Sequence, residues 1–262
     1  RATIFEGEKQ LGGVLRTGIP TYRLPRDVID REIGAILGLG VEAHCGEFLD
    51  RSRVIDLGTK YDAVIVAAGF GRLRKLDVPG AELAGIEQGI RFLHRVNLEG
   101  GSPLRGHVVV LGGGNTAMDC ARSALRSGGS SVTVAYRRAR EEMPAIREEI
   151  EEAHREGIEF LFQRQPIGFH GSGRVSELEL AEVEMGEPDD TGRRRPLVTQ
   201  RTARLKCDHV LLALGQSADL NLLPESSAIA EGRVRTAAGE TNIFVAGDFA
   251  TGEVDRFLAG LR

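Results

Sequence analysis

Cysteine is scarce in this sequence, and its few copies are widely separated. The 262 residues contain three cysteines, Cys45, Cys120 and Cys207. They form no C-x-x-C redox pair, no zinc-binding spacing and no iron-sulfur ligand run. The six histidines also lack metal-ligand spacing. We therefore expect neither a metal site nor a catalytic protein nucleophile in this chain.

The sequence also lacks a membrane span and a strong excess of one charge. No apolar run approaches the roughly 20 residues that cross a bilayer, and we expect no signal peptide in this sequence. The net charge of -4 argues against a nucleic acid as the main partner. We expect a soluble, cytoplasmic protein that binds neither nucleic acids nor membranes.

A glycine-rich turn is the most informative feature that is present. The apolar run from Val108 to Leu111 is followed by Gly112, Gly113 and Gly114, and then by a helix-like stretch containing Ala117. This is G-x-G-x-x-A in the order strand, turn, helix. Glycine lets the backbone approach a pyrophosphate, whose charge the helix N-terminus favours. The turn predicts a dinucleotide site, and the alternative is a glycine turn in an ordinary βαβ unit.

The residues after the next predicted strand indicate which dinucleotide is bound. Ser131 to Tyr136 alternates as a strand does, and Arg137 and Arg138 follow where an NAD-selective site has an acidic residue. A carboxylate there would repel a 2′-phosphate, whereas guanidinium groups bind it through charge-assisted hydrogen bonds. The sequence therefore favours NADPH over NADH.

An internal repeat suggests a second nucleotide site. YDAVIVAAGF (61–70) and CDHVLLALGQ (207–216) share the frame x-D-x-V-x-x-A-x-G, and ATIFEG (2–7) parallels VTVAYRR (132–138). In this second pair Glu6 takes the place of the arginines, and a carboxylate there accepts hydrogen bonds from an unphosphorylated ribose, as in FAD or NAD. The glycine loop serving Glu6 would precede Arg1, so either the sequence is a fragment or this site is incomplete by nature.

The rest of the sequence gives a coarse order of elements. The positions of glycine and proline and the hydrophobic periodicity predict helices at 27–39, 86–98 and 144–156. They also predict strands at 63–67 and 243–246, a small β excursion at 41–60 and strand-like runs in 158–206. Residues 100–103 are predicted to form a linker.

Five segments carry motifs that occur together in one known family: GGVLRTGIPTYRLP (12–25), VVVLGGGNTAMDCARSALR (108–126), YRRAREEMPA (136–145), MGEPDDTGRRRP (185–196) and FVAGDFATG (244–252). They resemble the NADPH-dependent glutamate synthase small subunits, and also the equivalent domains of dihydropyrimidine dehydrogenase. The resemblance implies an α/β fold with two Rossmann-like dinucleotide-binding domains, the NADPH domain being inserted into the FAD domain. The expected ranges are 1–100 and 218–262 for the FAD domain and 101–217 for the NADPH domain.

The resemblance also implies roles for individual residues. FAD would be contacted by Glu6, Gly12, Gly13, Val14, Arg16, Arg23, Leu49, Ala67, Ala68, Gly69, Gly247 and Asp248. NADPH would be contacted by Gly112, Gly113, Gly114, Asn115, Thr116, Arg137, Arg138, Ala213, Leu214 and Gly215. No catalytic side chain is expected, because flavin chemistry needs only positioning by the protein.

The implied function is an NADPH-dependent, FAD-containing electron-input module. It would pass electrons from NADPH through the flavin to iron-sulfur clusters of a large catalytic subunit or domain. Two alternatives stay open: an NADPH-binding but flavin-deficient, non-catalytic fragment, and the input module of another enzyme such as a dihydropyrimidine dehydrogenase. Because the family's FAD glycine loop is not among these residues, we expect the chain to bind NADPH better than FAD.

Overall fold

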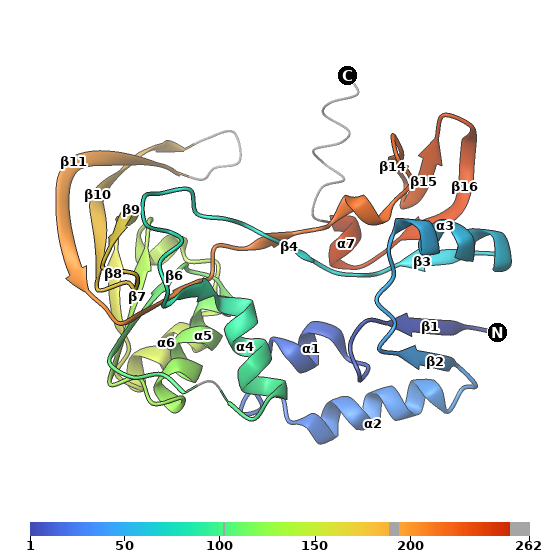
Figure 1. Ribbon diagram of the computed structural model, residues 1–262, viewed down its shortest axis with the longest axis horizontal. Coiled ribbons are helices and arrows are strands. Elements are labelled where there is room, and N and C mark those ends of the chain that lie inside the picture. The colour runs from blue at the N-terminus through green and yellow to red at the C-terminus, as the bar shows by residue number, and fades with distance from the viewer. Residues whose placement is uncertain (102, 189–193, 252–262) are drawn as a thin grey trace. The chain divides into compact units, whose positions relative to one another are not determined.

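The computed structural model describes residues 1–101, 103–188 and 194–251 (Figure 1), so parts of the predicted 100–103 linker and of the 185–196 and 244–252 segments lie outside the described residues. The chain forms two compact units. The first unit contains Arg1–Val14, Ile29–Arg74 and the chain from Gln216 onward, and the second unit contains Leu15–Val28 and Lys75–Gly215. The second unit thus starts well before residue 101, because β5 (Ile86–Gln88) and α4 (Gly89–Leu98) belong to it.

A five-stranded parallel sheet forms the centre of the second unit. Its order is β5, β12 (His209–Leu212), β6 (His107–Leu111), β7 (Ser131–Tyr136) and β8 (Glu159–Phe162). The crossovers carry α5 (Asn115–Arg126), a short 3-10 turn η1 (Arg140–Glu142) and α6 (Arg147–Arg155). A parallel strand buried on both faces reads as a continuous apolar run, and Val108 to Leu111 are at most 1% exposed.

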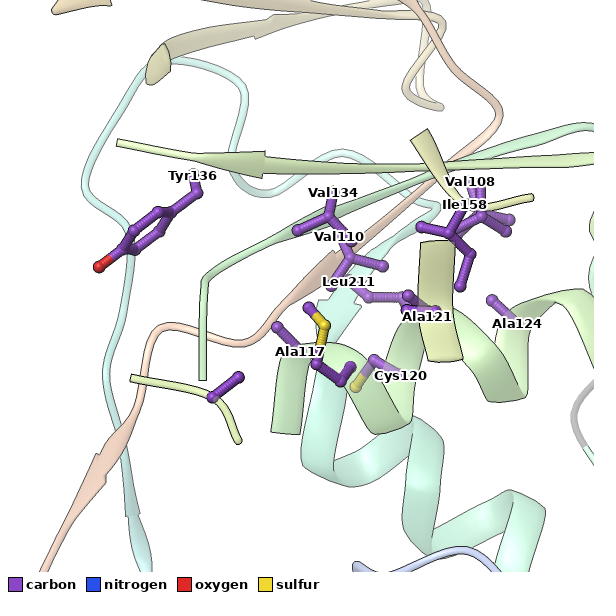
Figure 2. Close-up of a cluster of buried hydrophobic side chains, with 14 of the residues drawn as sticks. Val108, Val110, Ala117, Cys120, Ala121, Ala124, Val134, Tyr136, Ile158 and Leu211 are labelled. Carbon is purple, nitrogen blue, oxygen red and sulfur yellow. The ribbon is translucent and has the colours of Figure 1, made fainter. Parts of the chain in front are cut away.

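Alternate residues of β6 pack against two different layers. Val108 and Val110 lie toward α5, whose small residues allow close approach to the sheet (Figure 2). Val109 and Leu111 belong to a separate buried cluster that includes residues of a second sheet. That sheet is antiparallel, with the order β11 (Arg194–Lys206), β10 (Glu177–Pro188) and β9 (Arg164–His170). The sheet carrying the glycine turn is therefore covered on both faces.

The first unit contains three smaller sheets. β1 (Thr3–Glu6) pairs in parallel with β2 (Glu42–Cys45), and β4 (Arg72–Leu73) pairs with β13 (Gln216–Ser217). The third has the order β14 (Ala228–Ala230), β15 (Arg233–Thr236), β16 (Gly239–Val245) and β3 (Val64–Val66), with β16 and β3 parallel. The helical elements are α3 (Arg51–Lys60), η2 (Leu220–Leu222) and α7 (Asp248–Thr251). α1 (Gly13–Thr17) and α2 (Arg26–Leu37) contain the points where the chain changes unit.

Two sequence-based element predictions were wrong in part. The predicted β excursion at 41–60 contains only the short strand β2, and residues 51–60 form α3. Asp50 begins this helix by accepting a hydrogen bond from the Arg53 N–H at 2.9 Å, and Val54 and Leu57, three residues apart, are buried on one face. The predicted helix at 86–98 begins only at Gly89, because Ile86–Gln88 pair with β12 as a strand.

Candidate dinucleotide-binding sites

The carboxyl edge of the five-stranded sheet brings together three predicted NADPH segments. Gly112–Gly114 follow β6, Arg137 and Arg138 follow β7, and Ala213–Gly215 follow β12. These strands are neighbours and parallel, so their carboxyl ends meet at one edge. In open α/β sheets this is the edge where nucleotides bind.

The three glycines of the turn differ in what a side chain at each position would contact. A Cβ at Gly112 would lie 2.3 Å from the Ala213 carbonyl oxygen, and its φ of +147° is uncommon for other residues. A Cβ at Gly113 would lie 2.5 Å from the ring of Tyr136. At Gly114 the nearest atom, Pro144 Cγ, is 4.0 Å away and φ is -92°. Protein contacts therefore explain Gly112 and Gly113, whereas the space beside Gly114 is open.

Helix α5 begins directly at this open space. Gly114 is its N-cap, and within the described part of the chain no side chain makes a capping hydrogen bond there. The first backbone N–H groups of a helix have no intrahelical acceptor and attract anions. Asn115 does not cap α5, because its Oδ1 accepts a hydrogen bond from the Ile146 N–H at 2.8 Å. The Asn115 side chain thus holds the start of α6.

The two arginines after β7 differ in their surroundings. Arg137 is exposed, whereas Arg138 is half-buried. The Nε of Arg138 is buried and has no hydrogen-bond partner among the described residues. A buried donor without a partner is costly, so it favours an acceptor from outside the chain.

The remaining predicted NADPH residues pack against the turn. The Ala213 N–H donates to the Leu111 carbonyl at 2.8 Å, and Gly215 has a φ of +92°. Leu214 is partly buried against the cluster that contains Leu111 and Val109. The end of β12 therefore shapes one side of the glycine turn.

The first unit places some of the predicted FAD residues together. Ala67–Gly69 follow β3, and Gly247 and Asp248 follow the adjacent parallel strand β16, where the Ala246 N–H donates to the Val66 carbonyl at 3.1 Å. Gly69 and Gly247 both have a φ of +63°, and among the described residues neither has an atom within 4 Å of an added Cβ. The turns that follow β3 and β16 therefore lie next to each other, and each has open space beside its glycine.

Other predicted FAD residues lie on separate elements of the chain. Glu6 ends β1, and its Oε1 accepts a hydrogen bond from the Glu8 N–H at 2.9 Å. Gly12 precedes α1, Gly13 and Val14 begin it, and Leu49 packs against the buried cluster of the first unit. Arg16 is buried within α1.

Arg23, which the resemblance assigns to FAD, makes ion pairs within the second unit. Its Nη1 donates to both carboxylate oxygens of Asp119, at 2.8 and 2.9 Å, and its Nε lies 2.8 Å from Oε1 of Glu149. Arg122 also binds Glu149, at 2.7 Å. Arg23 therefore fastens residues 15–28 to α5 and α6 within the second unit.

Tyr22 reinforces this attachment. The guanidinium groups of Arg122 and Arg126 lie 4.8 and 4.2 Å from the centroid of its ring. Burial raises the pKa of Tyr22 to about 12, so the phenol stays neutral. Sequence reasoning missed this cluster, because Tyr22 and Arg23 are about a hundred residues from their partners.

The described residues offer no other obvious chemical centre. Within them, no group of three or more His, Cys, Asp or Glu side chains is arranged to hold a metal ion. None of the helices in these same parts of the chain combines the length and apolar character of a membrane span. The nucleotide-type sites are therefore the features to compare with known proteins.

Comparison with protein families gives a match over most of the chain. The family described as "Pyridine nucleotide-disulphide oxidoreductase" matches residues 29–260. The chain belongs to this family. The predicted resemblance to glutamate synthase small subunits is also confirmed by sequence similarity, as the next comparisons show.

Several curated members of this group are similar in sequence. The NADP(+)-dependent formate dehydrogenase subunit beta of Moorella thermoacetica is 39% identical, with 96% of this chain and 37% of the relative covered. The glutamate synthase [NADPH] small chain of Escherichia coli is 33% identical, with 98% of this chain and 59% of the relative covered. The chain thus spans less than two thirds of the length of these relatives.

Solved structures confirm the fold. FprA of Mycobacterium tuberculosis in complex with NADPH has a TM-score of 0.79 at 18% identity, with 99% of this chain and 77% of FprA covered. Thioredoxin reductase of T. acidophilum has a TM-score of 0.61 at 15% identity, with 95% and 82% covered. The prediction of an α/β fold with two Rossmann-like domains is therefore confirmed.

The disulphide chemistry in the family description finds no support in the cysteines of this chain. All three are free, and Cys120 and Cys207 are buried. Burial raises the pKa of both thiols, that of Cys207 to about 12. Because the thiolate is the reactive form, these two thiols are poorly suited to exchange reactions.

Proposed function

We propose that the second unit binds NADPH at the carboxyl edge of its parallel sheet. The observation that carries this proposal is the open space at Gly114, directly in front of the N-terminus of α5. A glycine that no protein contact requires is expected where a ligand approaches the main chain. The backbone from Gly112 to Thr116 would hold the pyrophosphate, and Ala213–Gly215 would line the adjacent strand end.

Arg137 and Arg138 would bind the 2′-phosphate. The buried Nε of Arg138 lacks a partner among the described residues, so it supplies a donor that a phosphate oxygen can satisfy. Arg137 is exposed and adds a second positive charge at the same strand end. Together they favour NADPH over NADH.

The first unit would hold FAD. Open positive-φ turns at Gly69 and Gly247 let a cofactor approach the main chain, and the Glu6 carboxylate would accept hydrogen bonds from the adenosine ribose. Gly12, Gly13, Val14, Leu49 and Asp248 of the same unit would complete the contacts. A flavin held there would supply hydride acceptance from NADPH and the release of single electrons. The residues of this chain bind and orient, and none is needed as an acid, base or nucleophile.

The larger role that fits this chemistry is electron input to a partner subunit. Relatives are named as the small chain of glutamate synthase and as the beta subunits of an NADP(+)-dependent formate dehydrogenase and an NADPH-Fe(3+) oxidoreductase. Their names share NADP(H) and a position within a multi-subunit enzyme, while the second substrate differs. This supports a common input module that works with a larger partner subunit, and we propose that iron-sulfur clusters of that partner receive the electrons. Glutamate synthase is the first candidate for the whole enzyme, and pyrimidine reduction is an alternative.

Replacing Arg137 and Arg138 together by alanine tests the choice of cofactor. The variant loses charge-assisted contacts of about 1.5 to 3 kcal/mol each, so NADPH affinity should fall by at least roughly tenfold. NADH affinity should barely change, as measured by calorimetric titration of both nucleotides. Arg155→Ala serves as a control, because it removes an exposed positive charge at the C-terminal end of α6. Equal losses for both nucleotides would show that the arginines do not recognise the phosphate.

We also expect this chain to bind NADPH more tightly than FAD. In the described part of the first unit, α1 and α7 are short, and the N-terminus of α3 is occupied by the Asp50 carboxylate. A pyrophosphate gains most from a longer helix with free N–H groups, which α5 offers in the second unit. Equilibrium dialysis should therefore give a lower Kd for NADPH than for FAD.

A visible flavin spectrum in the purified chain decides between the two open functions. Stoichiometric FAD would contradict the expected weaker flavin binding and would support an active flavoprotein. NADPH binding without flavin would favour the alternative of a nucleotide-binding module that does not turn over.

A further inference from the structure

Gln163 is a one-residue corner between the two sheets of the second unit. It follows β8, which ends at Phe162, and precedes β9, which begins at Arg164. Its φ is +54°, and among the described residues only Ser226 and Glu231 share a positive φ without being glycine. A left-handed backbone is unfavourable for a residue with a side chain and persists only where the surroundings impose it.

Three hydrogen bonds fix the Gln163 side chain and carbonyl. Its side-chain Nε2 donates to the Val183 carbonyl at 3.1 Å. Its own carbonyl accepts from the Val183 N–H at 2.9 Å and from Nη1 of Arg164 at 3.0 Å. The two bonds to Val183 thus hold Gln163 against β10, and the Gln163 N–H takes part in neither of them.

That N–H donates to the main chain of a predicted 2′-phosphate residue. The Gln163 N–H lies 3.1 Å from the Arg138 carbonyl oxygen. In the register of β7 and β8, Tyr136 pairs with Phe162, so the two chains leave their strands side by side. The hydrogen bonds that fix Gln163 therefore also restrain the backbone of Arg138. This is the residue whose buried Nε lacks a partner within the described chain.

We propose that Gln163 is a positioning residue for recognition of the 2′-phosphate. Its left-handed backbone holds the Arg138 main chain in one place, so the guanidinium is preorganised instead of being ordered by the ligand. Preorganisation of this kind increases affinity without a new contact. The inference rests on the proposed NADPH site and names a residue that touches no part of the nucleotide.

The test compares substitutions that differ in their tolerance of positive φ. β-branched residues resist it, glycine adopts it freely, and asparagine is enriched there. The probes are adenosine 2′,5′-bisphosphate and AMP, which differ in the 2′-phosphate and need no flavin. Gln163→Val should raise the Kd of the bisphosphate by about fivefold or more, because part of a charge-assisted contact is lost. In the same variant the Kd of AMP should change by less than about twofold. In Gln163→Gly and Gln163→Asn, the Kd of the bisphosphate and the Kd of AMP should each change by less than about twofold.

A double-mutant cycle with Arg138→Ala identifies the route of the effect. If Gln163 acts through Arg138, adding Gln163→Val to Arg138→Ala should give no further loss of bisphosphate affinity. Additive losses, or equal weakening of both probes by Gln163→Val, would overturn the proposal and indicate a corner that only shapes the sheets. Should Gln163→Val not fold by circular dichroism, Gln163→Leu, which also disfavours a positive φ but is not β-branched, replaces it with the same two criteria. If Arg138→Ala itself leaves bisphosphate affinity unchanged, the proposed phosphate site fails, whatever Gln163 does.

Discussion

Gly114→Val should abolish measurable NADPH binding while leaving the fold intact. The added side chain meets no protein atom closely, since the nearest atom to a Cβ there is 4.0 Å away and the backbone has an ordinary φ of -92°. The branched side chain would occupy the space that the pyrophosphate needs in front of α5. We expect affinity to fall by at least about a hundredfold in calorimetric titration. Circular dichroism and the melting temperature should stay near those of the original protein.

The neighbouring glycine supplies the matched comparison. Gly113→Val places its Cβ 2.5 Å from the Tyr136 ring, so it should lower the melting temperature as well as NADPH affinity. Gly114→Ala adds less volume than valine and should give a smaller loss of binding than Gly114→Val. Normal NADPH binding by Gly114→Val would mean that the glycine turn serves only the fold.

Arg23→Met should destabilise the second unit strongly. The substitution leaves the Asp119 carboxylate, whose side chain is 6% exposed, without the guanidinium that contacts both its oxygens. Removing one partner of a buried ion pair costs about 3–5 kcal/mol. At roughly 2–4 °C per kcal/mol for a unit of this size, we expect the melting temperature to fall by about 6 °C or more. Arg147→Met, an exposed arginine on α6, should change it little.

The pH dependence and a double variant test the cause of this loss. Burial raises the pKa of Asp119, and Arg23 opposes that rise. Without Arg23 the pKa should rise further above its unfolded value, so the folded variant takes up a proton more readily than the unfolded chain. The difference in stability between Arg23→Met and the original protein should therefore shrink as the pH falls through the raised pKa of Asp119 in the folded variant. Arg23→Met with Asp119→Asn should be more stable than Arg23→Met alone at neutral pH. A pH-independent deficit would point to lost packing instead.

The elements that carry the proposed NADPH site could be predicted from sequence because their information is local. Strand, glycine turn, helix, strand and arginine pair follow one another between residues 108 and 138, and each junction has its own residue preference. Parallel pairing of β6 with β7 then brings Arg138 to the same edge as Gly114. The prediction required only the order of elements.

The Arg23 cluster could not be predicted in this way. Arg23 and Asp119 are 96 residues apart, and neither sequence neighbourhood indicates the other. The positive φ of Gln163 is also invisible in sequence, because glutamine has no special preference for it. The prediction for residues 51–60 was wrong, because the loose alternation of 41–60 indicates strands whereas Asp50 begins a helix there. Each of these features depends on tertiary contacts or on one capping residue.

The placement of residues 15–28 constrains how this protein can be divided or recombined. The chain changes unit after Val14, Val28, Arg74 and Gly215, which makes four passages instead of the two expected for a simple insertion. A chimera that takes residues 75–215 from one relative and the rest from another would separate Asp119 and Glu149 from the Arg23 that neutralises them. Exchange of this unit between homologous enzymes should therefore succeed only when the short stretch at 15–28 travels with it, so the two distant pieces of sequence are expected to be inherited as one module.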